Sequence, residues 1–97
     1  MVEHIVLFKF KETTTQEEKE EGMRRLKALK DKLPGILDLQ VGHNFSDRGK
    51  GYTMGLVVRF ESKKALEHYG PSPEHQAVVQ YLDQIGCIDK LAVDFEF

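Results

Sequence analysis

The chain has 97 residues, of which 40% are hydrophobic and 31% are charged, as is typical of one soluble globular domain. Its 14 Lys and Arg against 16 Asp and Glu give a net charge of -2, which argues against a nucleic-acid-binding surface. The single cysteine excludes an internal disulfide, and the longest apolar run is far shorter than the roughly 20 residues of a membrane span. No leader pattern opens the sequence, so we expect a cytoplasmic protein without membrane insertion.

The first half of the chain predicts a strand, a helix and a second strand. Residues 2 to 11 are rich in Val, Ile and Phe, and a threonine just after them can cap the helix that follows. Apolar residues recur at helical spacing from Gln16 to Leu33, and Pro34-Gly35 ends that helix. A second strand is expected from Ile36 to about Phe45.

The second half predicts a hairpin partner, a broken helix and a last strand. The polar stretch from Ser46 to Gly51 joins the second strand to an antiparallel third, Tyr52 to Glu61. Ser62 can cap a helical region that breaks at Gly70-Pro71-Ser72-Pro73 and resumes from Glu74 to Ile85. A final strand alternates from Ile88 to Phe97.

This βαββαβ order predicts a single α+β domain over residues 1–97, with a ferredoxin-like antiparallel sheet and the helices on one face. The first strand is apolar on both faces, with Val6 and Phe8 on one and Ile5 and Leu7 on the other. Helices cover only one face, so we expect a second copy to cover the other and make a homodimeric α+β barrel. A monomer with a tolerated apolar patch is the alternative.

Four ordered motifs resemble the stress-responsive A/B barrel (Dabb) family over nearly the whole chain. They are His4-Ile5-Val6-Leu7-Phe8-Lys9-Phe10-Lys11, Leu33-Pro34-Gly35-Ile36, Gly51-Tyr52-Thr53 and Pro73-Glu74-His75. The resemblance implies a dimeric α+β barrel, found among stress-stable plant proteins, bacterial proteins of unknown role and a plant polyketide cyclase. Fold transfers between relatives more safely than activity.

The cyclase of this family implies a candidate site between sheet and helices. Its catalytic tyrosine and histidine match Tyr69 and His75, and a histidine near its start matches His4. Where it has a further histidine this chain has Met54, and the His-Pro frequent before the helical histidine is Ser72-Pro73 here.

Each candidate residue has a functional and a structural interpretation. His75 can act as a general base because an ordinary histidine pKa is near 6.5, with Tyr69 as its orienting group; alternatively His75 only bonds the broken helix and Tyr69 only packs. His4 is a polar pocket group or a hydrogen-bonded structural histidine. Tyr52 and Met54 share the alternation of Leu56, Val58 and Phe60, which can line a ligand cavity or belong to the core.

No metal site, cofactor or reactive thiol is expected. The four histidines lie on different elements without a metal-ligand spacing, and Cys87 has neither a second cysteine nor a basic activator beside it. Some relatives hold a magnesium-like ion on backbone carbonyls, here around Leu33 to Leu39, which leaves no side-chain signature.

Three functions remain open. The first is a dimeric stress-response protein whose cavity binds a small apolar or aromatic molecule lined by Tyr69 and His75. The second is a cofactor-free cyclase or aldol-type lyase using His75 and Tyr69. The third is a structural stress protein without a ligand, which a filled interior beside His75 would favour.

Overall fold

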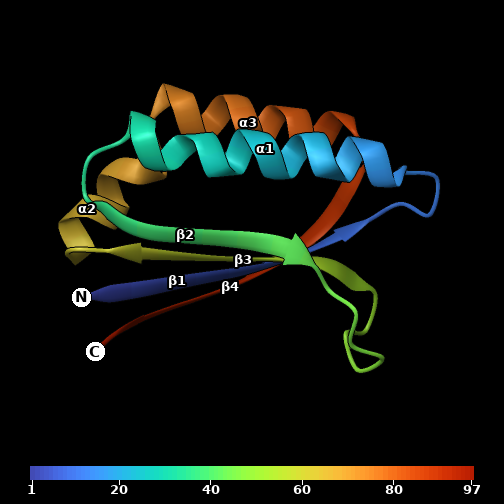
Figure 1. Cartoon of the computed structure of the whole chain (residues 1–97), viewed down its shortest axis with the longest axis horizontal. Coiled ribbons are helices and arrows are strands. Elements are labelled where there is room, and N and C mark those ends of the chain that lie inside the picture. The colour runs from blue at the N-terminus through green and yellow to red at the C-terminus, as the bar shows by residue number, and fades with distance from the viewer.

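A computed structural model describes residues 1–97 as one sheet with its helices on one face (Figure 1). The elements are β1 Val2–Phe10, α1 Gln16–Lys32, β2 Ile36–His43, β3 Tyr52–Phe60, α2 Lys63–Tyr69, α3 Pro73–Gln84 and β4 Cys87–Glu96. The strands lie in the order β2-β3-β1-β4, and every neighbouring pair is antiparallel. The predicted ferredoxin-like order is therefore confirmed, with the second helical region divided into α2 and α3.

The start of α1 is fixed by a capping box. The Thr15 side chain accepts a hydrogen bond from the Glu18 backbone N–H, and the Glu18 carboxylate accepts one from the Thr15 N–H. These bonds satisfy amides that a helix start otherwise leaves unpaired. At the other end, the turn into β2 uses Gly35 at a φ of 84°, a left-handed conformation that glycine adopts without strain.

The core lies between the sheet and the helices. The largest fully buried side chains are Phe60, Leu29, Met54, Leu82 and Val58, contributed by β3, α1 and α3. Alternate residues of β1 point into the same layer, because successive side chains of a strand face opposite sides. The sheet thereby presents its other alternate residues on the face that the helices do not cover.

Two details differ from the sequence-based expectation. Strand β2 ends at His43 rather than near Phe45, because the Asn44 side chain turns the chain, donating to the Tyr52 carbonyl and accepting from the Ser46 N–H. An irregularity between Phe8 and Lys9 shifts the register of β1 against β3. Tyr52 therefore lies with Lys9 and Asp89 and does not continue the buried alternation that ends at Met54.

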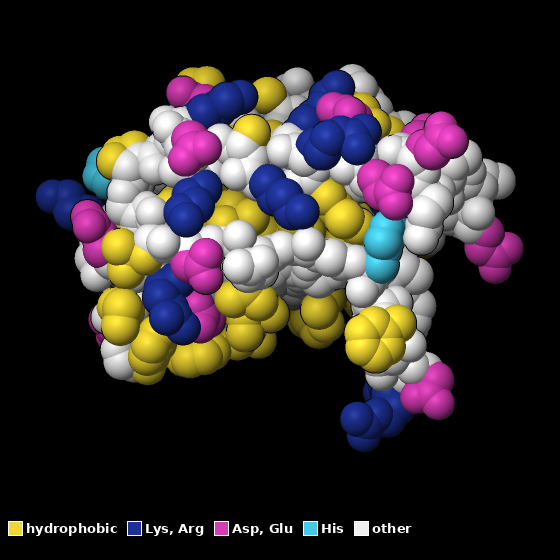
Figure 2. Space-filling model, in the orientation of Figure 1, with side chains coloured by type: hydrophobic (Ala, Val, Ile, Leu, Met, Phe, Trp, Pro, Cys, Tyr) yellow, Lys and Arg dark blue, Asp and Glu magenta, His cyan; other side chains and the backbone are white.

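The uncovered face of the sheet is apolar, and we call it the open face. Figure 2 shows hydrophobic side chains gathered along the side of the sheet away from the helices. Its strongly exposed members are Val57, Leu91, Val93 and Phe95, with Ile5 and Leu7 partly exposed among them. The two chain ends meet at one corner of the same sheet, where Met1 and Phe97 bond to each other. None of the helices has the length and apolar content needed to span a membrane.

Candidate functional site

The junction between α2 and α3 positions the candidate residues. The Ser72 hydroxyl donates to the Tyr69 carbonyl at 2.8 Å and accepts from the His75 N–H at 3.3 Å, so one side chain joins the end of α2 to the start of α3. Pro73 follows as the first residue of α3, where the missing N–H is not needed. Tyr69 and His75 are thereby held on the same side of the junction.

Tyr69 is buried with its hydroxyl unsatisfied. The residue is 3% exposed, and its ring lies 5.0 Å from that of Phe60 and 4.3 Å from that of His75 between centroids. The hydroxyl oxygen is inaccessible and makes no hydrogen bond to any group of the chain. Burial disfavours the phenolate and raises the pKa of Tyr69 to about 12. This group therefore stays protonated at physiological pH and can donate one hydrogen bond.

His75 presents one free ring nitrogen. Its Nδ1 lies 2.9 Å from the Gly70 carbonyl oxygen, which can only accept, so Nδ1 carries a proton. In the neutral ring Nε2 is then the bare nitrogen. Partial burial holds the pKa of His75 below the ordinary histidine value, although the Gly70 bond opposes this shift. Neutral His75 is consequently favoured, and it can accept a proton at Nε2.

His4 joins the same cluster from β1. Its ring lies 5.9 Å from Tyr69 and 6.2 Å from Phe60 between centroids, both edge-on. Its Nδ1 bonds the Asp94 carboxylate on β4, the strand paired directly with β1 at that position. The structure thus gathers His4, Tyr69 and His75 and adds Asp94, which the sequence did not indicate. Only the β1–β4 register could have revealed Asp94.

One opening connected to this cluster is a groove between α2 and β4. It has a volume of about 380 Å³ and is lined by Val2, Lys63, Leu66, Glu67, Asp94, Phe95 and Glu96. Asp94 connects this groove to His4, while neither Tyr69 nor His75 lines any of the five main hollows of the surface. No main hollow opens at these two side chains, which is the arrangement that the structural alternative predicts, so a ligand could reach them only if the packing around α2 shifts.

Tyr52 and Met54 lie away from this cluster. Met54 is fully buried and pairs with Phe8, four residues along β1 from His4. Tyr52 lies beyond it, and its hydroxyl donates to Asp89 at 2.6 Å. That hydrogen bond raises the pKa of Tyr52 and lowers the pKa of Asp89. The structure therefore does not bring these two residues together with Tyr69.

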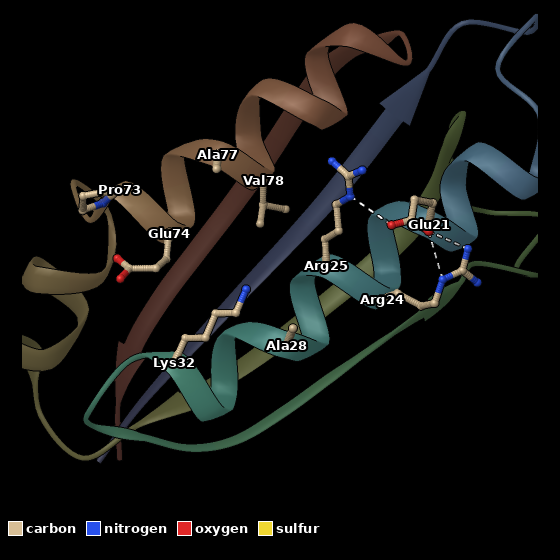
Figure 3. Close-up of a pocket in the computed structure, with 9 residues that line it drawn as sticks. All are labelled: Glu21, Arg24, Arg25, Ala28, Lys32, Pro73, Glu74, Ala77 and Val78. Atoms are coloured by element: carbon tan, nitrogen blue, oxygen red, sulfur yellow. Dashed lines mark hydrogen bonds and ion pairs between the residues drawn. The ribbon is translucent and has the colours of Figure 1, made fainter.

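The largest hollow is a groove of about 630 Å³ between α1 and α3 (Figure 3). Glu21 lies in it and pairs with both Arg24 and Arg25. Neither Tyr69 nor His75 lines this groove, and its charged wall is that of a solvated helix surface. No group of three or more His, Cys, Asp or Glu side chains is close enough to hold a metal ion.

Comparison with known proteins identifies the family to which this geometry belongs. The Stress responsive A/B Barrel Domain family, Dabb, matches residues 2–97. Olivetolic acid cyclase of Cannabis sativa is 32% identical over 76 residues, which are 76% of this chain and 75% of the cyclase.

Solved structures share the fold over nearly the whole chain. A dimeric protein of unknown function and ferredoxin-like fold from Bacteroides fragilis is 32% identical, with a TM-score of 0.80 over 99% of this chain and 95% of the other. The hydroxynitrile lyase of Passiflora edulis is 18% identical, with a TM-score of 0.84 over 97% and 90%, and shows the fold alone. Three of the similar structures are described as dimeric.

Proposed function

The chain belongs to the stress-responsive A/B barrel (Dabb) family, and from this we propose that it works as a homodimer that binds a small, largely apolar or aromatic molecule carrying a carbonyl group. The observation that carries this proposal is the buried Tyr69 hydroxyl without a hydrogen-bond partner. Leaving such a group unpaired costs about 1–3 kcal/mol, so packing alone gives no reason to keep it. A ligand carbonyl oxygen would supply the missing acceptor.

The groove between α2 and β4 is the proposed entrance by which a ligand reaches Tyr69. Its wall combines apolar Val2, Leu66 and Phe95 with Asp94, which is bonded to His4 beside the Tyr69 ring. Helix α2 has only seven residues and carries both Leu66 of the groove wall and Tyr69 of the cluster. Short helices with few neighbours open at low free-energy cost, so we expect α2 to shift when a ligand enters.

A second candidate function is aldol-type catalysis, which the state of His75 favours. Bare Nε2 of His75 would remove a proton from the carbon next to a ligand carbonyl, and the Tyr69 hydroxyl would donate to the resulting enolate oxygen. The enolate carbon would attack a second carbonyl, and the proton on His75 would pass to the new alkoxide. Similarity to olivetolic acid cyclase supports this class of chemistry, whereas buried Met54 offers no second base.

Binding is tested with phenylacetone, a small aromatic ketone, by following backbone amide shifts in NMR titrations. We expect shifts along α2 and β4 and at least a tenfold weaker affinity in Tyr69→Phe, because the donor to the carbonyl is lost. Tyr81→Phe is the matched control, since the Tyr81 hydroxyl donates to the Glu18 carbonyl away from the cluster. Equal affinity in wild type and Tyr69→Phe would refute the proposed role of the hydroxyl.

Catalysis is tested with the same ketone in D₂O by measuring exchange of its α-protons. Wild type is expected to accelerate exchange, and His75→Gln to return it to the rate of buffer. His68→Gln is the control, because His68 is exposed on the neighbouring helix. Full exchange activity in His75→Gln would exclude His75 as the base while leaving binding at Tyr69 intact.

A further inference from the structure

A hollow on the open face has glycines where the rest of that face has side chains. Gly42 of β2 and Gly55 of β3 are direct partners in the register, and Leu7 of β1 pairs with Gly55. Together with Val57 and Gln40 they line a hollow of about 390 Å³. The open face is therefore indented at this point rather than filled.

The single chain gives no reason for these glycines. A Cβ built at Gly42 meets nothing within 4 Å, and one at Gly55 meets only the Leu7 Cδ2 at 3.9 Å. Neither position has a positive φ, in contrast to Gly35, Gly51 and Gly86. Glycine also weakens a strand because it loses more backbone freedom on folding than other residues. Something outside the chain must account for the empty space.

We propose that the hollow floored by Gly42 and Gly55 is a socket that receives an apolar side chain from the open face of a second copy. This proposal rests on the homodimer of the proposed function. Leu7, which lines the hollow, pairs with Leu91 of β4, and exposed Leu91 and Val93 lie on the same open face and need a cover. Two packed sheets interdigitate side chains across about 10 Å, so a side chain protruding from one face requires a recess in the other.

The β2–β3 loop supports a second copy as the occupant. This loop descends past the sheet on the side opposite the helices, so it flanks whatever covers the open face (Figure 1). Asn44 lines the hollow, and the next residue, Phe45, is 100% exposed. An aromatic side chain in this position would bury its ring against the second copy. The dimeric state of similar solved structures agrees with this occupant.

The decisive variant is Gly42→Val, studied by sedimentation equilibrium over a wide range of protein concentration. A Cβ at this position meets no atom of its own chain within 4 Å and valine is a better strand former, so the fold is expected to remain. In the dimer it occupies the socket, and we expect the dissociation constant to rise at least tenfold. Gly42→Ala, which adds one methyl group, should give a smaller rise in the dissociation constant. It replaces Gly42→Val in this test if the larger side chain prevents folding.

Gly70→Ala is the matched control. A Cβ at Gly70 also meets nothing within 4 Å, but this residue lies at the α2–α3 junction away from the open face. The dimer dissociation constant of Gly70→Ala should equal that of the wild type. A dimer that Gly42→Val leaves as tight as wild type would overturn the socket alone. A wild-type protein that stays monomeric would instead overturn the homodimer on which the socket depends.

Discussion

The rings of Tyr69 and His75 lie 4.3 Å apart across the α2–α3 junction, yet the Tyr69 hydroxyl bonds neither His75 nor any other group. The two rings pack against each other at an interplanar angle of 43°, and the hydroxyl of the tyrosine makes no bond to the protein. A residue selected for stability alone would be phenylalanine at this position.

Replacing Tyr69 by Phe should make the protein more stable. The change removes a buried hydroxyl without a partner and keeps the ring contacts, so we expect a gain of about 1 kcal/mol in the free energy of unfolding. Urea denaturation at pH 7 measures it. Tyr81→Phe should instead lose about 1 kcal/mol because it breaks a bond to Glu18, and a loss of that kind in Tyr69→Phe would show that its hydroxyl is satisfied.

Alkaline pH should destabilise the wild type through Tyr69. Its pKa is about 12 in the folded protein and near 10 when unfolded, so between these values the unfolded chain releases a proton that the folded chain retains. The free energy of unfolding is unaffected by Tyr69 below pH 10 and falls as the pH rises, by at most about 2.7 kcal/mol at pH 12. The stability difference between Tyr69→Phe and the wild type should widen in this range, since only the wild type has this phenol.

Acidic pH should destabilise the protein through His75. Burial lowers its folded pKa below the unfolded value near 6.5, so the unfolded chain binds the proton first as pH falls. The stabilising contribution of neutral His75 to the free energy of unfolding is complete above pH 6.5. It is lost as the pH falls through the pKa of His75 in the folded protein. An NMR titration of the His75 ring checks the direction of the shift, and His75→Gln should remove this part of the pH dependence.

Gly86→Ala should be one of the more damaging small substitutions. Gly86 has a φ of 109°, and a Cβ there would lie 2.6 Å from the Thr14 Oγ1, which itself donates to the Ile85 carbonyl. Strain and the displaced hydroxyl together should cost about 1–3 kcal/mol. Thermal denaturation measures the loss against Gly70→Ala, which adds the same methyl group in open space.

Much of the fold could be predicted from sequence because its signals are local. The threonine cap, the Pro34-Gly35 stop and the break before α3 each act over a few residues, and the structure has elements at these places. The predicted end of β2 was wrong, because hydrogen bonds of the Asn44 side chain turn the backbone after His43. The predicted face of the sheet for Tyr52 was also wrong, because that face depends on the register irregularity between β3 and β1.

The candidate site could be predicted only in part. Family motifs indicated His4, Tyr69 and His75, and the structure brings their rings together. Asp94 was missed because its bond to His4 joins residues 90 positions apart, and no periodicity carries that information. The packed interior beside His75 was also beyond reach, since the space between side chains depends on the whole core.

The meeting of the two chain ends makes the topology of the domain almost circular. The Met1 amino group donates to the Phe97 carbonyl at 3.2 Å, and the Phe97 N–H donates to the Met1 carbonyl at 3.0 Å. A short linker could therefore close the backbone into a ring without bending the sheet. Closing 97 residues would remove about 4 kcal/mol of conformational entropy from the unfolded chain. New ends could then be opened in the exposed β2–β3 loop, turning the edge strand β4 into an internal segment of the chain.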